Sequence, residues 1–398
     1  MANLATSLSA VMAKYYDNVF LEAMQEKLVL DKWTDKKTVP LWRGKAVSYF
    51  AYYPITPTTT AITEGSSTNN EVTIAAQTVE ATVAKYAQWV PYTELVKLTS
   101  RDKNLQGAVK LFGNAAAESL EMILAAELFQ KGSIPIRVDQ LSNSTTNTFE
   151  GTIDASASAT TTTFKDATLT QNNSFWKGAH FAALAGSTQN YRYGSMVSDW
   201  ASTGDAGTLT TAAPVAFTAA TTKYRMVSGS GLAAANIITG TALEYAVAKA
   251  RENKFYTFPG GWFKASLAPQ VEYDLQKNTV FRNLGQYQQA SKLEKGDIGQ
   301  LWGVDFNRCT IPYRETVAGA YSATGVVFCT PIMGMHALGN VSLAGMREHK
   351  ILMKFPGPTS TNEPYDEKGT IAYRFYAAPK ALNASWCINL MSGATGVA

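Results

Sequence analysis

The chain of 398 residues is long enough for one large domain or several smaller ones, and its 46% hydrophobic content excludes a disordered protein. Only 17% of the residues are charged, against about 25% in typical soluble domains, which indicates that part of the surface lies against other subunits. The formal net charge of +4 is too balanced to predict binding to nucleic acid or membrane.

The sequence shows no signal for export or for insertion into a membrane, which indicates the compartment in which the protein is made. No run of about 18 apolar residues occurs, and the first residues do not form a secretory signal, so we expect a soluble protein that is made in the cytosol and does not span a membrane. Cys309, Cys329 and Cys387 form no CxxC pair and are odd in number, so we expect buried thiols and no disulfide.

The first segment carries apolar residues three and four positions apart, which predicts an amphipathic helix within residues 4–28. These residues are Leu8, Val11, Met12, Tyr15, Val19, Phe20 and Leu28. Two interpretations stay open: the helix packs on its own domain, or it is an arm that grips a neighbouring subunit.

The next segment predicts a long hairpin. Residues 45–53 and 71–83 are rich in β-branched and aromatic types, which favour strands. Between them, Pro54, Pro57 and Gly65 exclude a regular helix and favour an exposed tip. Because such a projecting arm has little to pack on in its own domain, we expect its partner to be another chain.

Residues 103–131 give the clearest helix signal, with apolar residues recurring from Leu105 to Leu128. Thr99 or Ser100 could cap this helix, and Gly132 is placed to end it in the left-handed conformation. Small residues would let another element approach the helix closely. They are Gly113, Ala115, Ala116 and Ala117.

Residues 141–230 differ from the rest, because 29 of these 90 residues are Ser or Thr and only 10 are charged. The aromatic residues favour an inserted β-rich module with a small core of its own over a disordered linker. They are Trp176, Phe181, Tyr191, Tyr193 and Trp200.

The remaining chain predicts interleaved helices and strands without a regular βαβ period, which indicates an α+β domain with a mixed or antiparallel sheet. Helices are expected at 241–252 and 268–277. Strands are expected at 262–267, 304–310, 325–330, 347–354, 370–377 and 383–390.

Catalytic and cofactor motifs are weak throughout. His180, His336 and His349 are too few and too scattered for a metal site, so we expect structural roles for them. The GxGxxA match at 229–234 is followed by Asn236 and Gly240 before any helix begins, which favours a flexible exit from the inserted module over a dinucleotide site. We expect no catalytic residue, no cofactor and no metal.

Three carboxylates on the long helix lie at spacings that could pair them for acid–base chemistry. They are Glu118, Glu121 and Glu127. Such chemistry needs a pocket that shifts their pKa values, and nothing in the sequence predicts one. We therefore expect a solvated or inter-subunit face.

The order of N-terminal arm, long hairpin, long helix, insertion and mixed α+β domain resembles the HK97-like fold of tailed-bacteriophage major capsid proteins. The branch that it resembles more closely is that of podophages related to phage N4. The residues that carry the resemblance are Tyr15, Tyr16, Leu28, Gly44, Lys45, Pro54–Pro57, Ile62–Gly65, Leu98, Thr99, Asp102, Gly296–Gly299, Gly303, Val304, Tyr376–Ala378, Leu382 and Asn383.

The resemblance implies a division of the chain and a function. The segments would be an N-terminal arm (1–33), an extended loop hairpin (34–80), a peripheral domain with a spine helix (81–140), a β-rich insertion domain (141–235) and an axial domain with returning peripheral-domain strands (236–398). The chain would form pentamers and hexamers of an icosahedral virion that encloses double-stranded DNA, contacted weakly and nonspecifically. Scaffolding, portal and decoration proteins would be further partners.

The resemblance also suggests subunit contacts at Tyr15, Phe20, Ile55, Ile62, Glu64, Gly65, Arg101 and Asp102. Residues 54–80 contain no lysine, so we expect no covalent crosslink from the loop tip. The alternatives are the shell protein of a cellular nanocompartment, a β-rich phage tail or decoration protein, and an enzyme with an unrecognised site.

Overall fold

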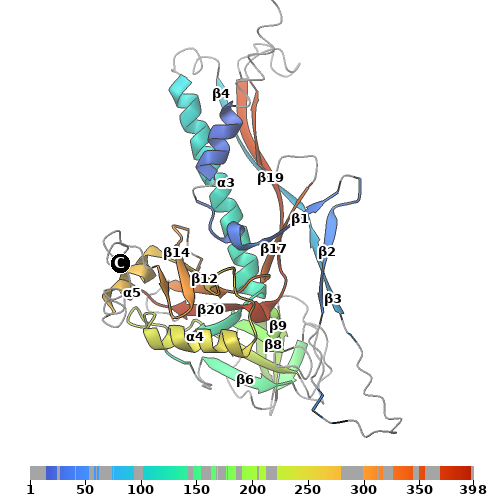
Figure 1. The fold of residues 1–398 in the computed structure, drawn as a ribbon, viewed down its shortest axis with the longest axis vertical. Coiled ribbons are helices and arrows are strands. Elements are labelled where there is room, and N and C mark those ends of the chain that lie inside the picture. Colours follow the sequence, from blue (N-terminus) through green and yellow to red (C-terminus); the bar gives the residue numbers. More distant parts are fainter. Residues whose placement is uncertain are drawn as a thin grey trace, which may run out of the picture.

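The computed structural model describes residues 15–24, 27–40, 42–52, 58–59, 61, 74, 76–93, 102–141, 147–153, 163–166, 168, 176, 178–184, 191–203, 206–211, 222–278, 299–311, 313–316, 326–343, 349–354 and 368–395. Figure 1 shows three parts: an upright body along a long helix, a wider lower body, and a hairpin that projects at one side.

The upright body is a helix packed on a sheet. Its elements are α3 (Asp102–Lys131), β4 (Ala84–Thr93), β18 (His349–Lys354) and β19 (Lys368–Ala381). Strand β19 pairs antiparallel with β4 on one side and β18 on the other. Alternate β19 residues from Ile371 to Ala377 are buried, as are α3 residues from Val109 to Leu128 at helical spacing, and these two faces form one core. The predicted long helix is confirmed.

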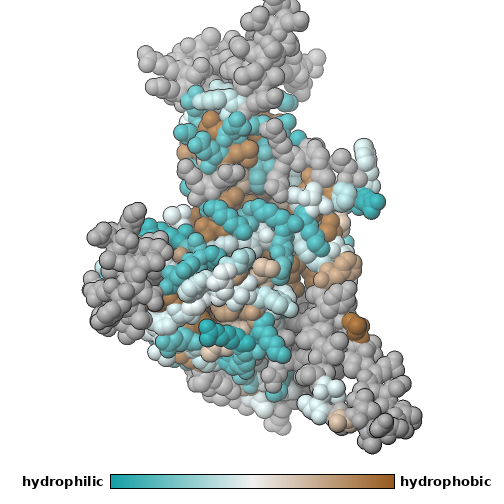
Figure 2. Space-filling view, viewed as in Figure 1, coloured by the Kyte–Doolittle hydropathy of each residue, from teal (hydrophilic) through white to brown (hydrophobic). Residues whose placement is uncertain are grey.

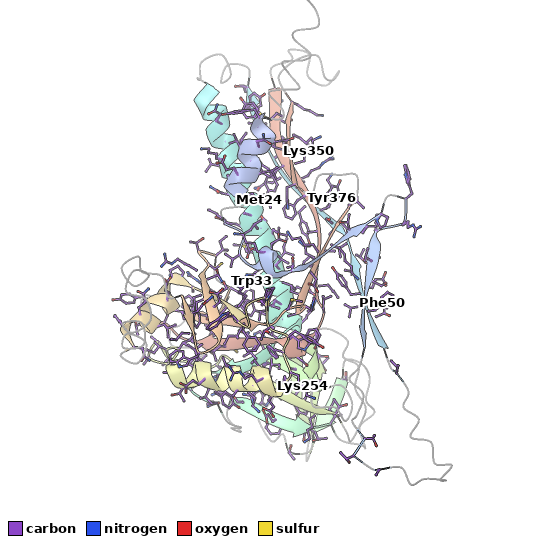
Figure 3. All side chains as sticks on the ribbon, viewed as in Figure 1. Met24, Trp33, Phe50, Lys254, Lys350 and Tyr376 are labelled. Carbon is purple, nitrogen blue, oxygen red and sulfur yellow. The ribbon has the colours of Figure 1, made fainter. Side chains whose placement is uncertain are left out.

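A helix at residues 15–24, the N-terminal helix, lies along α3 (Figure 1). Its buried face consists of Tyr16, Phe20 and Met24, four residues apart, and Figure 3 shows Met24 beside α3. For residues 15–24, the first of the two interpretations is therefore correct: the helix packs on its own chain. Tyr15 was expected on the apolar face, but its side chain is half exposed because the helix turns Tyr16 inward instead.

The close approach of these two helices depends on Gly113. A Cβ atom at this position would lie 2.7 Å from the backbone oxygen of Phe20 and 3.0 Å from the Cβ of Ala23. The prediction that small residues allow another element to approach is confirmed here.

We expect Gly113→Ala to destabilise the chain by about 1–3 kcal/mol, because the helices must separate to admit the methyl group. Gly107→Ala is the matched control, since a Cβ at Gly107 meets nothing within 4 Å and alanine there should stabilise the helix by about 0.5–1 kcal/mol. Urea unfolding of both variants checks the opposite signs. Equal changes in unfolding free energy would contradict this account of Gly113.

The predicted role of Gly132 is wrong in its mechanism. The helix does end at Lys131, but Gly132 does not adopt the left-handed conformation. A Cβ on Gly132 would instead lie 2.5 Å from the Cβ of Ala381. Glycine is required there because β19 crosses the end of α3 at close range.

The hairpin consists of β2 (Ala46–Tyr52) and β3 (Ala76–Thr82), paired antiparallel with Tyr49 opposite Val79. One face packs on β1 (Asp35–Val39) and β17 (Leu338–Leu343), which run parallel to each other. Both predicted strands are confirmed over these ranges. The expected tip at residues 54–70 falls almost wholly outside the described residues.

The lower body has a mixed seven-stranded sheet, as expected for an α+β fold. Its order is β13-β14-β12-β16-β20-β5, with β15 beside β16, and the β12–β14 and β20–β5 pairs are parallel. The strands are β5 (Ile134–Arg137), β12 (Phe263–Leu267), β13 (Gln300–Leu301), β14 (Val304–Arg308), β15 (Arg314–Thr316), β16 (Val326–Met333) and β20 (Cys387–Ser392). Helices α4 (Gly240–Glu252) and α5 (Pro269–Lys277) contribute to its core. Thr239 caps α4, and Pro269 starts α5 with a preset backbone angle.

The inserted segment forms a six-stranded sheet with a separate core, which confirms the β-rich prediction. The order β6-β11-β8-β9-β10-β7 joins β6 (Thr148–Thr152), β7 (Thr163–Asp166), β8 (His180–Leu184), β9 (Tyr191–Thr203), β10 (Ala206–Thr211) and β11 (Lys223–Val227). Trp176 and Phe181 are buried in it as expected, whereas the side chains of Tyr191, Tyr193 and Trp200 lie outside the described part.

The exit from this module is a packed turn, which corrects the expectation of a flexible link. Leu232 is fully buried, and Ala233 donates its backbone N–H to the side chain of Asn236. The next helix begins only at Gly240, so no helix N-terminus faces the 229–234 glycines.

Candidate subunit-contact surfaces

The N-terminal helix continues into an N-terminal strap, residues 27–33, which includes the short helix η1 (Leu30–Trp33). The buried carboxylate of Glu121, 1% exposed, accepts hydrogen bonds from the backbone N–H groups of Val29, Leu30 and Asp31 at 2.9, 3.0 and 3.2 Å. The expectation of a solvated or inter-subunit face is wrong for Glu121, because its charge satisfies the unpaired donors of a helix start.

Burial raises the pKa of Glu121, and the three backbone N–H groups partly oppose this rise. The other two carboxylates are engaged within the chain as well. Glu118 pairs with Lys27 of the strap at 2.9 Å, and Glu127 pairs with Lys131 at 2.9 Å. All three therefore have structural partners in place of the pocket that acid–base chemistry needs.

Of the predicted contact residues, the structure buries one, exposes one and does not describe the side chains of the others. Phe20 is 1% exposed in the core of its own chain, so its side chain has no surface left for a neighbour in this conformation. Tyr15 is 50% exposed beside Tyr16. Asp102 begins α3, but its side chain, and all of Ile55, Ile62, Glu64, Gly65 and Arg101, lie outside the described residues.

The hairpin has one packed face and one bare face. Tyr49 is buried against the body, donates to the backbone oxygen of Asp35 at 3.0 Å, and has its pKa raised to about 12 by burial, with a smaller effect of Asp35. The opposite side, which we call the hairpin outer face, consists of Phe50, Thr78 and Glu80, all exposed. Figure 3 shows Phe50 on the projecting hairpin.

A second exposed surface lies on the sheet, on the side away from α3. We call it the basic sheet face. Its residues are Lys85, Ala87 and Trp89 of β4, Ala372 and Arg374 of β19, and Lys350, Leu352 and Lys354 of β18. All of them except Lys350 line a groove of about 280 Å³, in which Trp89 is 62% exposed. The sequence analysis did not predict this face, because it is built by three segments that are distant from one another in the sequence.

Other large apolar side chains are exposed singly. Leu111 and Met122 lie three turns apart on one side of α3, and Trp42 sits in the β1–β2 turn at a positive φ of 67°. Figure 2 shows hydrophobic residues interspersed with hydrophilic ones over the upright body and the hairpin. Apolar side chains that are exposed singly are normal on protein surfaces, so these residues by themselves mark no contact surface.

The titratable residues form no reactive constellation within the described ranges. His180 makes a 2.9 Å contact from Nδ1 to the backbone oxygen of Phe129, and His336 contacts Asp35 at 2.6 Å. The three cysteines are buried free thiols, as expected. Over the same ranges, no group of three His, Cys, Asp or Glu side chains could hold a metal ion, and no helix is long and apolar enough to cross a membrane.

Comparison with known proteins gives structural matches alone: no protein-family model and no curated protein matches this sequence. A chain of the capsid of Ralstonia phage GP4 matches at a TM-score of 0.51 and 14% identity, over 91% of this chain and 87% of that one. This chain has the fold of a phage capsid protein. A chain of the mature capsid of bacteriophage PhiM1 also matches, at 0.51 and 11% identity, over 94% and 88% of the two chains.

The cyanophage Pam1 capsid gives a third match, at a TM-score of 0.50 and 12% identity, over 89% of this chain and 86% of that one. The expected HK97-like α+β fold is thereby confirmed. At 11–14% identity, the likeness carries the fold and assigns no role to an individual side chain.

Proposed function

We propose that this chain is the major capsid protein of a tailed bacteriophage, which assembles into the pentamers and hexamers of an icosahedral head around double-stranded DNA. The observation that carries the proposal is a shared fold over about nine-tenths of both chains with capsid proteins of GP4 and PhiM1. A projecting hairpin supports it, because its outer face is exposed within the described part of the chain and a neighbouring subunit would cover it.

Each segment of the chain has a proposed role in the capsid. We infer that residues 1–33 form an N-terminal arm, 34–80 an extended loop across the adjacent subunit, 81–140 a peripheral domain on the spine helix, 141–235 an insertion domain and 236–398 an axial domain with returning strands. Tyr15, Ile55, Ile62, Glu64, Gly65, Arg101 and Asp102 are the proposed contact residues. Assembly then buries surface that the single chain leaves bare, so stability and assembly are coupled.

Finer assignments belong to the same proposal. The ordered motifs from Tyr15 to Asn383 favour the branch of podophages related to phage N4. The location is the virion, after synthesis in the host bacterial cytoplasm, with scaffolding, portal and decoration proteins as partners. The role is structural and not enzymatic, and DNA contact at the inner wall is weak and nonspecific.

Negative-stain microscopy of the purified protein, concentrated to promote assembly, tests the function. We expect icosahedral shells or rings of five and six subunits. Fibres, or monomers that bind a small ligand, would contradict a shell role. Nucleic acid inside shells from infected cells supports the virion, whereas a protein cargo would identify a nanocompartment.

A further inference from the structure

We propose that the turn between β1 and β2 binds the phosphate backbone of double-stranded DNA and places Trp42 in the minor groove. We call this turn, residues 40–45, the basic turn. The inference rests on the proposed function, since the head encloses DNA, and it names the part of the chain that touches the packaged duplex.

The basic turn gathers positive charge that its own chain neutralises only in part. No carboxylate occurs in residues 36–63, whereas four bases do: Lys36, Lys37, Arg43 and Lys45. Lys36 pairs with Asp31 at 2.7 Å. Arg43 and Lys45 are exposed, and no carboxylate among the described residues forms an ion pair with either of them. These two bases are therefore available to an anionic ligand.

Trp42 lies in this turn in a backbone conformation that a bulky residue rarely adopts. The backbone N–H of Arg43 donates to the backbone oxygen of Pro40 at 3.3 Å, so Trp42 is the third residue of a β-turn, and its φ is +67°. Glycine and asparagine are the residues that favour a positive φ at this position. The side chain of Trp42 is 99% exposed, so packing within the described part of the chain does not offset the strain. A strained residue without an internal contact points to an external one.

The shape of the basic turn suits a groove of DNA. Figure 1 shows β1 and β2 meeting at the side of the molecule, away from α3. Lys37 precedes Trp42, and Arg43 and Lys45 follow it, so bases can reach phosphates on both sides of a groove that the indole enters. Proteins that bind the minor groove combine basic side chains with apolar side chains inserted at base steps. Because phosphates carry no sequence information, the binding does not depend on the DNA sequence.

A second copy of this chain matches the basic turn less well than DNA does. Within the residues that the structure describes, three exposed carboxylates form no ion pair, and each lies on a different element. They are Glu22 of the N-terminal helix, Glu80 of β3 and Glu244 of α4. No described acidic surface therefore faces two or more bases at once, whereas a duplex offers phosphates at regular, close spacing.

The basic sheet face also carries lysines, but its form is different. Its bases lie on a three-stranded sheet beside a groove lined by Trp89 and Leu352. A broad face cannot enter a groove of the duplex, and phosphates leave an apolar floor uncovered. This face therefore serves as the comparison in the test.

Charge reversal tests the phosphate contacts. We expect the double variant Arg43→Glu and Lys45→Glu to bind a short labelled DNA duplex about tenfold more weakly, and the slope of log affinity against log salt to fall by about 2. Fluorescence anisotropy of the unassembled protein at low salt measures both. Lys350→Glu with Lys354→Glu on the basic sheet face changes the net charge equally and is the matched control. It should leave the salt slope unchanged.

Trp42→Gly tests the role of the indole separately. Glycine adopts the positive φ without strain, so the midpoint of urea unfolding should stay the same or rise. The affinity for the duplex should nevertheless fall several-fold with an unchanged salt slope, because an uncharged contact is lost. A lower unfolding midpoint would show that Trp42 packs within its own chain and would overturn its assignment to DNA.

A third readout asks which side of the shell carries the basic turn. In intact shells, Arg43→Cys should resist a polyethylene glycol maleimide too large to cross the wall and should react after the shells are denatured. The three native cysteines are buried, so they add little background before denaturation. Rapid labelling of intact shells would place the turn outside, away from packaged DNA, and would overturn the proposal.

The outcomes separate this proposal from the function on which it rests. If the unmodified protein forms neither shells nor rings, the capsid function fails. If it assembles, but does not bind the duplex at low salt or binds it equally well after charge reversal in the turn, the DNA site is overturned. Loss of binding in the Lys350 and Lys354 variant alone would assign DNA to the basic sheet face. Normal DNA binding with impaired assembly of the turn variants would assign the turn to a contact between copies, and the proposal is overturned in both cases.

Discussion

Glu121→Ala should destabilise the folded chain by about 3–5 kcal/mol, because it leaves three backbone N–H groups of the N-terminal strap without an acceptor in a buried site. The carboxylate lies in the core, and its partners at Val29, Leu30 and Asp31 begin a short helix whose first N–H groups have no acceptor within that helix. We expect protease cleavage in the strap together with a lower urea midpoint for unfolding. Both are measured on the unassembled protein.

Glu118→Ala is the matched control on the same helix. Its carboxylate also holds the strap, through Lys27, but the two side chains are 42% and 33% exposed, so the loss should stay below about 1 kcal/mol. Equal losses in the two variants would contradict the view that burial and the three backbone hydrogen bonds set the importance of Glu121.

The pKa of Glu121 adds a pH signature. Because burial raises this pKa in the folded state, the folded chain binds a proton more tightly than the unfolded chain does. The resulting stabilisation is fully present below the unfolded pKa of about 4.3 and is lost as the pH rises through the folded pKa. The stability deficit of Glu121→Gln should therefore shrink as the pH rises through this window.

Local patterns in the sequence predicted those elements whose signal is local. The β-branched run at 45–53, the apolar spacing of 103–131 and the helical pattern of 241–252 all predict the structure observed at those positions. The α+β class and the separate core of the insertion also follow from local composition, since Trp176 and Phe181 have few other places to be buried.

The predictions that were wrong concern residues whose contacts lie far away in the sequence. Glu121 looks like a surface carboxylate because its three donors lie about 90 residues earlier. The role of Gly132 is decided by the close approach of Ala381, which lies far along the chain. Strand β17 was not predicted because its glycine and asparagine dilute the strand pattern that β1 and β19 complete.

The insertion offers a clear case of long-range coupling, because one buried side chain holds both of its ends. Arg137 lies at the end of β5, just before the chain enters the module. Its guanidinium binds both carboxylate oxygens of Asp139, at 2.9 and 2.8 Å, and donates to the backbone oxygens of Ser228 and Ser230 where the chain leaves. A second arginine, Arg225, donates to the backbone oxygen of Pro135 at 2.9 Å.

Arg137→Met should therefore loosen the insertion from the lower body at a cost of about 3–4 kcal/mol, since it leaves a partly buried carboxylate and two carbonyl oxygens without a donor. We expect faster hydrogen exchange in β6, β8 and β11 than in β12 and β16. Arg314→Met, at an exposed arginine of the same sheet, is the control and should change the unfolding free energy by less than about 1 kcal/mol. Uniformly faster exchange in every strand would mean that Arg137 supports the whole fold, and the insertion would then be no separate unit held by this clamp.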